Sequence, residues 1–126
     1  MAFAGLQQVR GAPPGRFTLS SSRETLERVQ LVCDHAGGRP YRSDALLQVV
    51  ALGAPPAEAA ASLASTMGVD AALLLDTPFV LLGRDAREAA EALLERRERY
   101  GFDSFTTHQP NLEALGEVIA AHRAMT

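Results

Sequence analysis

Lysine is absent from the sequence, and all twelve basic residues are arginine. Schiff-base chemistry and the phosphate-binding lysine of Walker-type sites both require a lysine side chain, so these two classes of enzyme are excluded. Cys33 is the only cysteine, so the chain cannot form an internal disulfide. Because Cys33 falls in a helical pattern, we expect it to be a small buried hydrophobe with a structural role.

Long apolar runs are missing as well. No run approaches the roughly 20 residues that span a bilayer, and the N-terminus lacks the pattern of a signal peptide. We therefore expect a cytoplasmic protein with no membrane partner. The net charge of −3 offers no basic surface for a nucleic-acid backbone, so nucleic acid is not expected as a partner. With 47% hydrophobic and 21% charged residues, the 126 residues predict one folded domain, 1–126.

The first third of the chain predicts a strand, a loop and a helix. Residues 1–6 are small and apolar and are typical of the end of a buried strand. The prolines and glycines of residues 11–15 predict a loop. Ser21 and Glu24 have the spacing of a capping box, which predicts a helix over residues 22–36. This helix would bury three positions: Leu26, Val29 and Cys33.

The central part predicts a second strand and two further helices. Residues 44–52 are mostly branched and apolar, as in a strand covered on both faces of a parallel sheet. Two prolines then suit the first turn of a helix that the alanine-rich residues 57–67 continue. Residues 70–75 predict a short helical piece. Residues 77–83 fit a short strand, an extended loop or part of a helix, and we assign them irregular structure.

The last part predicts a helix, a strand and a final helix. Asp85 occupies the N-cap position of a helix over residues 86–100. Helical spacing assigns one face to the core: Ala89, Ala90, Leu93, Leu94 and Arg97. The other face carries mixed charges typical of a solvated surface: Glu95, Arg96, Glu98 and Arg99. Residues 102–108 predict a strand, and Asn111 is expected to cap a helix through residue 124. The buried stripe of that helix would be Leu112, Leu115 and Ile119.

Helices that alternate with strands imply parallel strands joined by right-handed crossovers. The prediction is an α/β fold with two or three parallel strands and four to five helices. Such a small parallel sheet leaves strand edges that must be covered or paired, so we expect the chain to associate with a copy of itself or with another subunit.

No sequence motif identifies a cofactor or a nucleophile: G-x-G-x-x-G, phosphate-loop, H-E-x-x-H, C-x-x-C and G-x-S-x-G patterns are all absent. His35, His108 and His122 are too far apart for a local metal cluster, and no metal is predicted. His108 and Gln109 are the best site candidates, because ligands gather outside the carboxyl ends of parallel strands. Alternatively, His108 simply meets solvent at a turn. Gln48 either points a polar group into a pocket or bonds a neighbouring element.

Several strings together resemble a known family. They are M-A-F-A-G-L at 1–6, A-P-P-G-R-F-T-L at 12–19, L-L-Q-V-V-A-L at 46–52, D-T-P-F-V-L-L-G at 76–83, the helix at 86–102, D-S-F-T-T-H at 103–108 and N-L-E-A-L-G-E-V-I-A-A-H at 111–122. In combination they resemble the C-terminal part of luciferase-like monooxygenases, particularly the deazaflavin-dependent oxidoreductase branch. None of them is a catalytic signature.

This resemblance implies a TIM-like (β/α)₈ barrel that binds flavin mononucleotide or a deazaflavin (coenzyme F-420) at the carboxyl ends of its strands. Such a barrel has about 250 residues, and the chain resembles only its last quarter to third. No catalytic residue of the family can be placed on this sequence. Thr107, His108 and Gln109 would face the mouth of a completed barrel and are the expected cofactor-binding residues. Met1 would be an internal start, the start of a truncated gene product or the start of one half of a split enzyme.

Two functions follow. In the first, the chain is the C-terminal segment of a flavin- or deazaflavin-dependent oxidoreductase and is inactive alone, with no cofactor bound by this chain by itself. In the second, it is a non-catalytic dimerising or accessory module derived from that barrel, which pairs with its own copy or with a complementary barrel subunit. An independent small enzyme is a third alternative, which the missing motifs disfavour.

Overall fold

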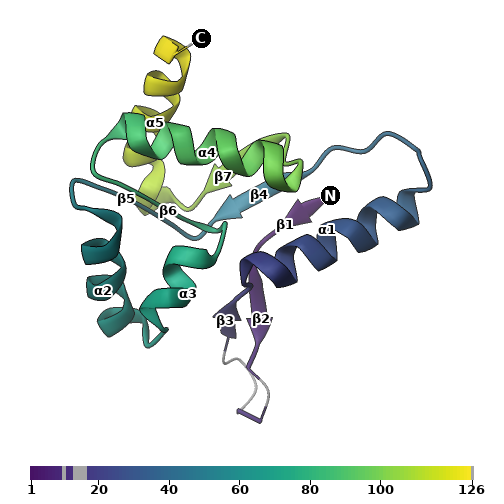
Figure 1. The fold of residues 1–126 in the computed structure, drawn as a ribbon, viewed down its shortest axis with the longest axis horizontal. Helices are drawn as coiled ribbons and strands as arrows, with labels where there is room; N and C mark the ends of the chain where they lie inside the picture. The colour runs from purple at the N-terminus through teal and green to yellow at the C-terminus, as the bar shows by residue number, and fades with distance from the viewer. Residues whose placement is uncertain (10, 13–16, 126) are drawn as a thin grey trace.

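The computed structural model describes residues 1–9, 11–12 and 17–125, and in this part of the chain helices follow single strands or groups of strands (Figure 1). The strands are β1 (Ala2–Phe3), β2 (Leu6–Gln8), β3 (Phe17–Leu19), β4 (Asp44–Leu47), β5 (Val49–Leu52), β6 (Val80–Gly83) and β7 (Ser104–Thr107). The helices are α1 (Ser22–Ala36), α2 (Pro56–Met67), α3 (Ala71–Asp76), α4 (Ala86–Tyr100) and α5 (Leu112–Met125), with a 3₁₀ turn, η1 (Gln109–Asn111), before α5. The predicted α/β class is confirmed.

Three parallel strands form the main sheet in the order β1-β4-β7, with β4 in the centre. In register, Asp44 of β4 lies opposite Ala2 of β1 and Ser104 of β7. The strand predicted over residues 44–52 continues past β4 as β5, which pairs in parallel with β6. This arrangement is that of a partial β/α fold.

The strand β6 corrects one prediction, because residues 77–83 were assigned irregular structure. All four residues of β6 are buried, and each pairs with a residue of β5 about thirty positions earlier in the chain. This short apolar run forms a strand because it pairs with β5, which is distant in the sequence. Sequence periodicity cannot reveal such a pairing.

Gln48 interrupts the long central strand between β4 and β5. Leu47 and Val50 contact the same hydrophobic cluster, whereas Val49 and Ala51 contact another cluster on the other side. Regular alternation would place Leu47 and Val49 on one face, so an extra residue has shifted the pattern. This bulge separates the half of the strand that pairs with β1 and β7 from the half that pairs with β6.

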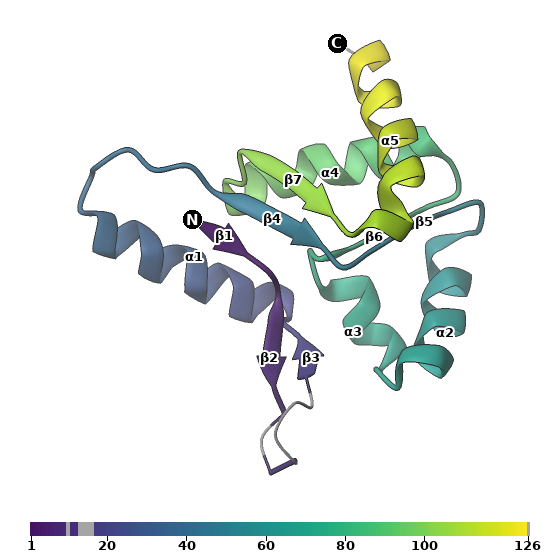
Figure 2. The same ribbon diagram turned by 180° about the vertical axis from the view of Figure 1, so that it is seen from behind.

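Helices α1 and α4 cover one face of the main sheet. Ala45 of β4 belongs to one hydrophobic cluster with Tyr100 of α4, and the partly buried Leu26 of α1 packs against this cluster. Helix α5 packs against α4 and β5, and its Leu115 belongs to the same cluster as Leu47. Helices α2 and α3 instead pack against β5 and β6. In Figure 2 strands β4 and β7 lie in front of α4, with the opposite face of the sheet toward the viewer.

Helix α1 has the predicted bounds and the predicted capping box. The Ser21 hydroxyl accepts from the Glu24 N–H at 3.1 Å, and the Glu24 carboxylate accepts from the Ser21 N–H at 3.0 Å. The predicted burial of Cys33 is wrong, because its side chain is exposed. Leu31 is also 69% exposed, so the second half of α1 extends beyond the core that its first turns contact.

An antiparallel pair, β2 with β3, follows β1 and was not predicted. The loop predicted at residues 11–15 lies partly outside the described residues. Within those residues, the structure has a turn at Gly11. No helix in the described part of the chain has both the length and the apolar character to cross a membrane.

Two predicted helix faces need correction. On α4 the apolar positions Ala89, Ala90 and Leu93 are buried as predicted, but Arg97 is exposed and Arg96 is partly buried. On α5 the buried residues are Leu115 and Val118, whereas two predicted core residues are exposed: Leu112 at 55% and Ile119 at 39%. In both helices the predictions fail for residues at the border between the buried and the exposed face. The periodicity of apolar residues gives the direction in which a helix face points, but it does not give the width of the buried stripe.

Candidate functional site

The carboxyl ends of three strands meet at the side chain of Gln48. Its Nε2 donates to the carbonyl oxygen of Ala4, just after β1, at 2.7 Å. Its Oε1 lies 3.0 Å from Nε2 of His108, which directly follows β7. Since Oε1 can only accept, the proton of a neutral His108 ring lies on Nε2, and Nδ1 is left as an acceptor. Of the two alternatives for Gln48, the structure shows the second, because its side chain bonds the segments that follow β1 and β7.

The backbone groups of Gln48 also form hydrogen bonds with other segments of the chain. Its N–H donates to the carbonyl oxygen of Phe79 at 2.7 Å, and its carbonyl oxygen accepts from Nδ2 of Asn111 at 3.3 Å. Asn111 was expected to cap the last helix, but it lies within η1 and α5 begins at Leu112. The side-chain amide of Asn111 therefore holds η1 against the bulge at Gln48. Gln48 thus forms hydrogen bonds with the segments after β1, before β6 and after β7.

The three predicted site residues face in different directions. His108 is exposed and contacts Gln48. Thr107 donates its hydroxyl to the carbonyl oxygen of Leu47 at 2.8 Å and is partly buried, because neighbouring strand residues point to opposite faces. Gln109 is exposed at the start of η1. The structure thus brings His108 together with Gln48 and places Thr107 on the helix-covered face of the sheet.

A polar strip leads along the uncovered face of the sheet toward His108. The Asp44 carboxylate accepts from the Ser104 hydroxyl at 2.7 Å and from the Thr106 hydroxyl at 3.2 Å. The register of β4 and β7 places these three residues on the same face as Gln48 and His108. Sequence reasoning missed them. The available signal was that polar residues recur at every second position from Ser104 to His108.

This uncovered face is unusual for a parallel sheet, which normally buries both faces. Thr106 and His108 are exposed, and so are Ala2 and Ala4 at the end of the sheet formed by β1. The groups on the face are hydroxyls, an amide, an imidazole and a carboxylate, which can bind the polar edge of a ligand by hydrogen bonds. Across the described residues, no three His, Cys, Asp or Glu side chains group together as metal ligands.

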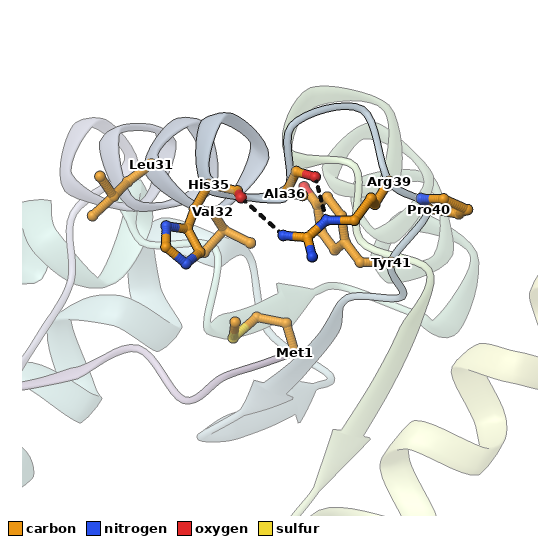
Figure 3. Close-up of a pocket in the computed structure, with 8 residues that line it drawn as sticks. All are labelled: Met1, Leu31, Val32, His35, Ala36, Arg39, Pro40 and Tyr41. Carbon is orange, nitrogen blue, oxygen red and sulfur yellow. Dashed lines mark hydrogen bonds between the residues drawn. The ribbon is translucent and has the colours of Figure 1, made fainter.

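A larger hollow lies at the other end of the sheet (Figure 3). It measures about 620 Å³ and lies between the second half of α1 and Met1, with Tyr41 on the segment that enters β4. Its walls are mostly apolar, including Leu31 and Val32. Arg39 turns back onto its own helix and donates to the carbonyl oxygens of residues 35 and 36. Since the hollow is beside the amino ends of β1 and β4, it is separate from the His108 site.

No family model, curated protein or solved structure matches this chain.

Proposed function

We propose that this chain is the C-terminal segment of a luciferase-like flavin- or deazaflavin-dependent oxidoreductase, and that it supplies the last β/α units of a (β/α)₈ barrel. The topology supports the proposal. Strands β1, β4 and β7 are parallel and lie side by side in the main sheet in their chain order. Helix α1 lies between β1 and β4 in the chain, helix α4 lies between β4 and β7, and both pack on one face of this sheet. Successive units of a barrel have this arrangement.

The observation that carries the proposal is the uncovered polar face with the joined pair Gln48 and His108 at its carboxyl end. In a (β/α)₈ barrel one face of the sheet faces the helices and the other lines the interior. Within the described residues, β1 and β7 each pair on one side only. Further strands would pair these edges and turn Asp44, Ser104 and Thr106 into interior residues.

In a completed barrel, residues at the carboxyl ends of the strands would hold the cofactor, FMN or coenzyme F-420. Nδ1 of His108 and the exposed amide of Gln109 offer an acceptor and a donor for the polar edge of a flavin-type ring. The cofactor itself supplies hydride transfer or oxygen activation. This chain's part is to position and shield it, so the chain by itself is inactive. The exposed, unpaired Cys33 suits a reducing compartment, and we place the protein in the cytoplasm.

The test combines a search of the neighbouring DNA with a measurement of cofactor binding. If the proposal holds, the neighbouring upstream DNA, read in all frames, encodes the first six barrel units. Co-expression of that product with this chain should then give a complex that retains FMN or coenzyme F-420, measured by absorbance and fluorescence. The chain alone should retain neither. A chain that encloses a cofactor without any partner would contradict the proposal.

A non-catalytic module that dimerises is the second candidate, and the hollow beside Met1 favours it. Met1 is 65% exposed and Leu31 is 69% exposed, next to the free edge of β1. A second copy of the chain would bury this apolar surface. A stable dimer without bound cofactor, together with upstream DNA that encodes no barrel units, would support this module over the oxidoreductase.

A further inference from the structure

Arg96 occupies an unexpected position on α4. Its sequence neighbours on the helix are solvated, but Arg96 is partly buried and its Nη1 donates to the carbonyl oxygen of Pro78, just before β6, at 3.1 Å. This is the single hydrogen bond found for its guanidinium in the described part of the chain. A guanidinium has five N–H donors, so most of its binding capacity is unused.

Arg96 also differs from three other arginines of this region in having no ion pair with a carboxylate in the described residues. These three pair with a glutamate four positions away: Arg84 with Glu88, Arg87 with Glu91 and Arg99 with Glu95. The positions four residues before and after Arg96 are Ala92 and Tyr100, so the helix offers it no acidic partner at this spacing.

Burial has a measurable electrostatic consequence at this position. Desolvation lowers the pKa of Arg96 to about 10, and the neighbouring Tyr100 and Glu95 oppose this shift in part, so the guanidinium is still charged at neutral pH. Burying a cation that forms no ion pair is unfavourable, and an anion that reached it would meet little competition from water. A partly buried guanidinium beside a hollow is therefore a physical reason to expect a ligand there.

A hollow of about 300 Å³ adjoins the guanidinium. Apolar side chains from α3 and β6 form most of its wall: Leu74, Leu75, Val80 and Leu82. Glu88 also lines it, but the Glu88 carboxylate accepts from the backbone N–H of Arg84 at 3.2 Å and pairs with the side chain of the same residue. A volume of this size is at the lower end for small-molecule sites. Arg96 faces mostly apolar side chains, and the Glu88 carboxylate beside them is paired with Arg84, so the hollow fits a small amphiphilic anion.

We propose that this hollow is a binding site for a small organic acid, whose carboxylate pairs with Arg96 and whose apolar part lies against Pro56 and Leu75. A carboxylate matches the planar fork of a guanidinium and forms two parallel hydrogen bonds with it. The site does not depend on the proposed oxidoreductase function. It lies between α3, β6 and α4, whereas His108 follows β7.

The test is titration of the purified chain with hexanoate and with 1-hexanol, followed by calorimetry and by NMR shifts of the hollow's methyl groups. Hexanoate should bind saturably, and 1-hexanol, which lacks the charge, should bind at least about tenfold more weakly. Arg96→Gln should weaken hexanoate binding by a similar factor. Arg97→Gln, which removes the exposed neighbouring charge, should leave it unchanged.

A second variant separates binding from folding. Ala92→Leu keeps Arg96 and narrows the hollow from the same helix, so it should block hexanoate if circular dichroism shows a folded chain. The proposal is overturned if the wild-type chain shows no saturation below about 10 mM hexanoate. It is also overturned if hexanoate and 1-hexanol bind equally, or if folded Arg96→Gln or Ala92→Leu retains the wild-type affinity.

Discussion

Oε1 of Gln48 lies 3.0 Å from Nε2 of His108, and this contact joins the bulge after β4 to the residue that directly follows β7. The same amide donates to Ala4 at the end of β1. The two residues are sixty positions apart in the chain, and parallel pairing of β4 with β7 brings them together. Gln48 therefore has a structural role that can be separated from any role of His108 toward a ligand.

Substitution of Gln48 by Leu should lower the free energy of unfolding by about 1 kcal/mol, because two hydrogen bonds are lost at a partly hydrated position. The measurement is denaturation by urea. His108→Ala removes only one of the two bonds and should cost less, while it reduces cofactor retention in the completed barrel. Equal losses of stability for the two variants would contradict the role assigned to Gln48.

Substitution of Gly5 by Ala should destabilise the chain strongly. Gly5 has a φ of 72°, and a Cβ at this position would overlap the ring of Phe79, which is 1% exposed. Left-handed strain and overpacking together should cost about 2–4 kcal/mol. The matched control is Gly116→Ala in α5, where a Cβ meets open space. It should gain about 0.5–1 kcal/mol. Thermal unfolding of both variants checks this, and a neutral Gly5→Ala would be inconsistent with the packing.

The stability of the α1 N-terminus should depend on pH through Glu24. The backbone N–H of Ser21 and the side-chain amide of Gln7 donate to its carboxylate and hold its pKa below the ordinary value of 4.5. Because the folded-state pKa is the lower one, this stabilisation is present above 4.5 and is lost as the pH falls through the folded-state pKa.

Glu24→Gln should remove the stabilisation that depends on the charge of Glu24. The difference in the free energy of unfolding between the wild type and this variant should therefore become smaller as the pH falls. The measurement is urea denaturation as a function of pH. Glu27→Gln is the control, since Glu27 is exposed and forms a surface ion pair with Arg23. Identical pH profiles for the wild type and Glu24→Gln would rule out this contribution.

Self-association should depend on the apolar surface beside Met1. Size-exclusion chromatography with light scattering should report a dimer or larger species for the chain alone. Leu31→Glu should shift it toward monomer, because a charge would be buried in the interface. Leu112→Glu, an exposed leucine on α5, is the control. A wild-type monomer at high concentration would argue against association.

The candidate site was visible in the sequence only as separate residues. His108 was singled out by its place after a strand, and Gln48 by its polarity within an apolar run. Neither signal showed that the two side chains touch or that Asp44, Ser104 and Thr106 share their face. Arg96 was predicted to be solvated, but it lies at the border of the buried face of α4. The segment that leads into β6 packs there and makes Arg96, not Arg97, the partly buried arginine.

The sequence by itself determined the helices and the fold class. Caps such as Ser21 and Asp85, glycines after helix ends and the 3.6-residue period all act within a few residues, so they can be interpreted locally. Only the tertiary structure decided that residues 80–83 form a strand, that the central strand bulges at Gln48 and that Cys33 is exposed. These features depend on contacts between residues that are distant in the chain, and no local pattern encodes such contacts.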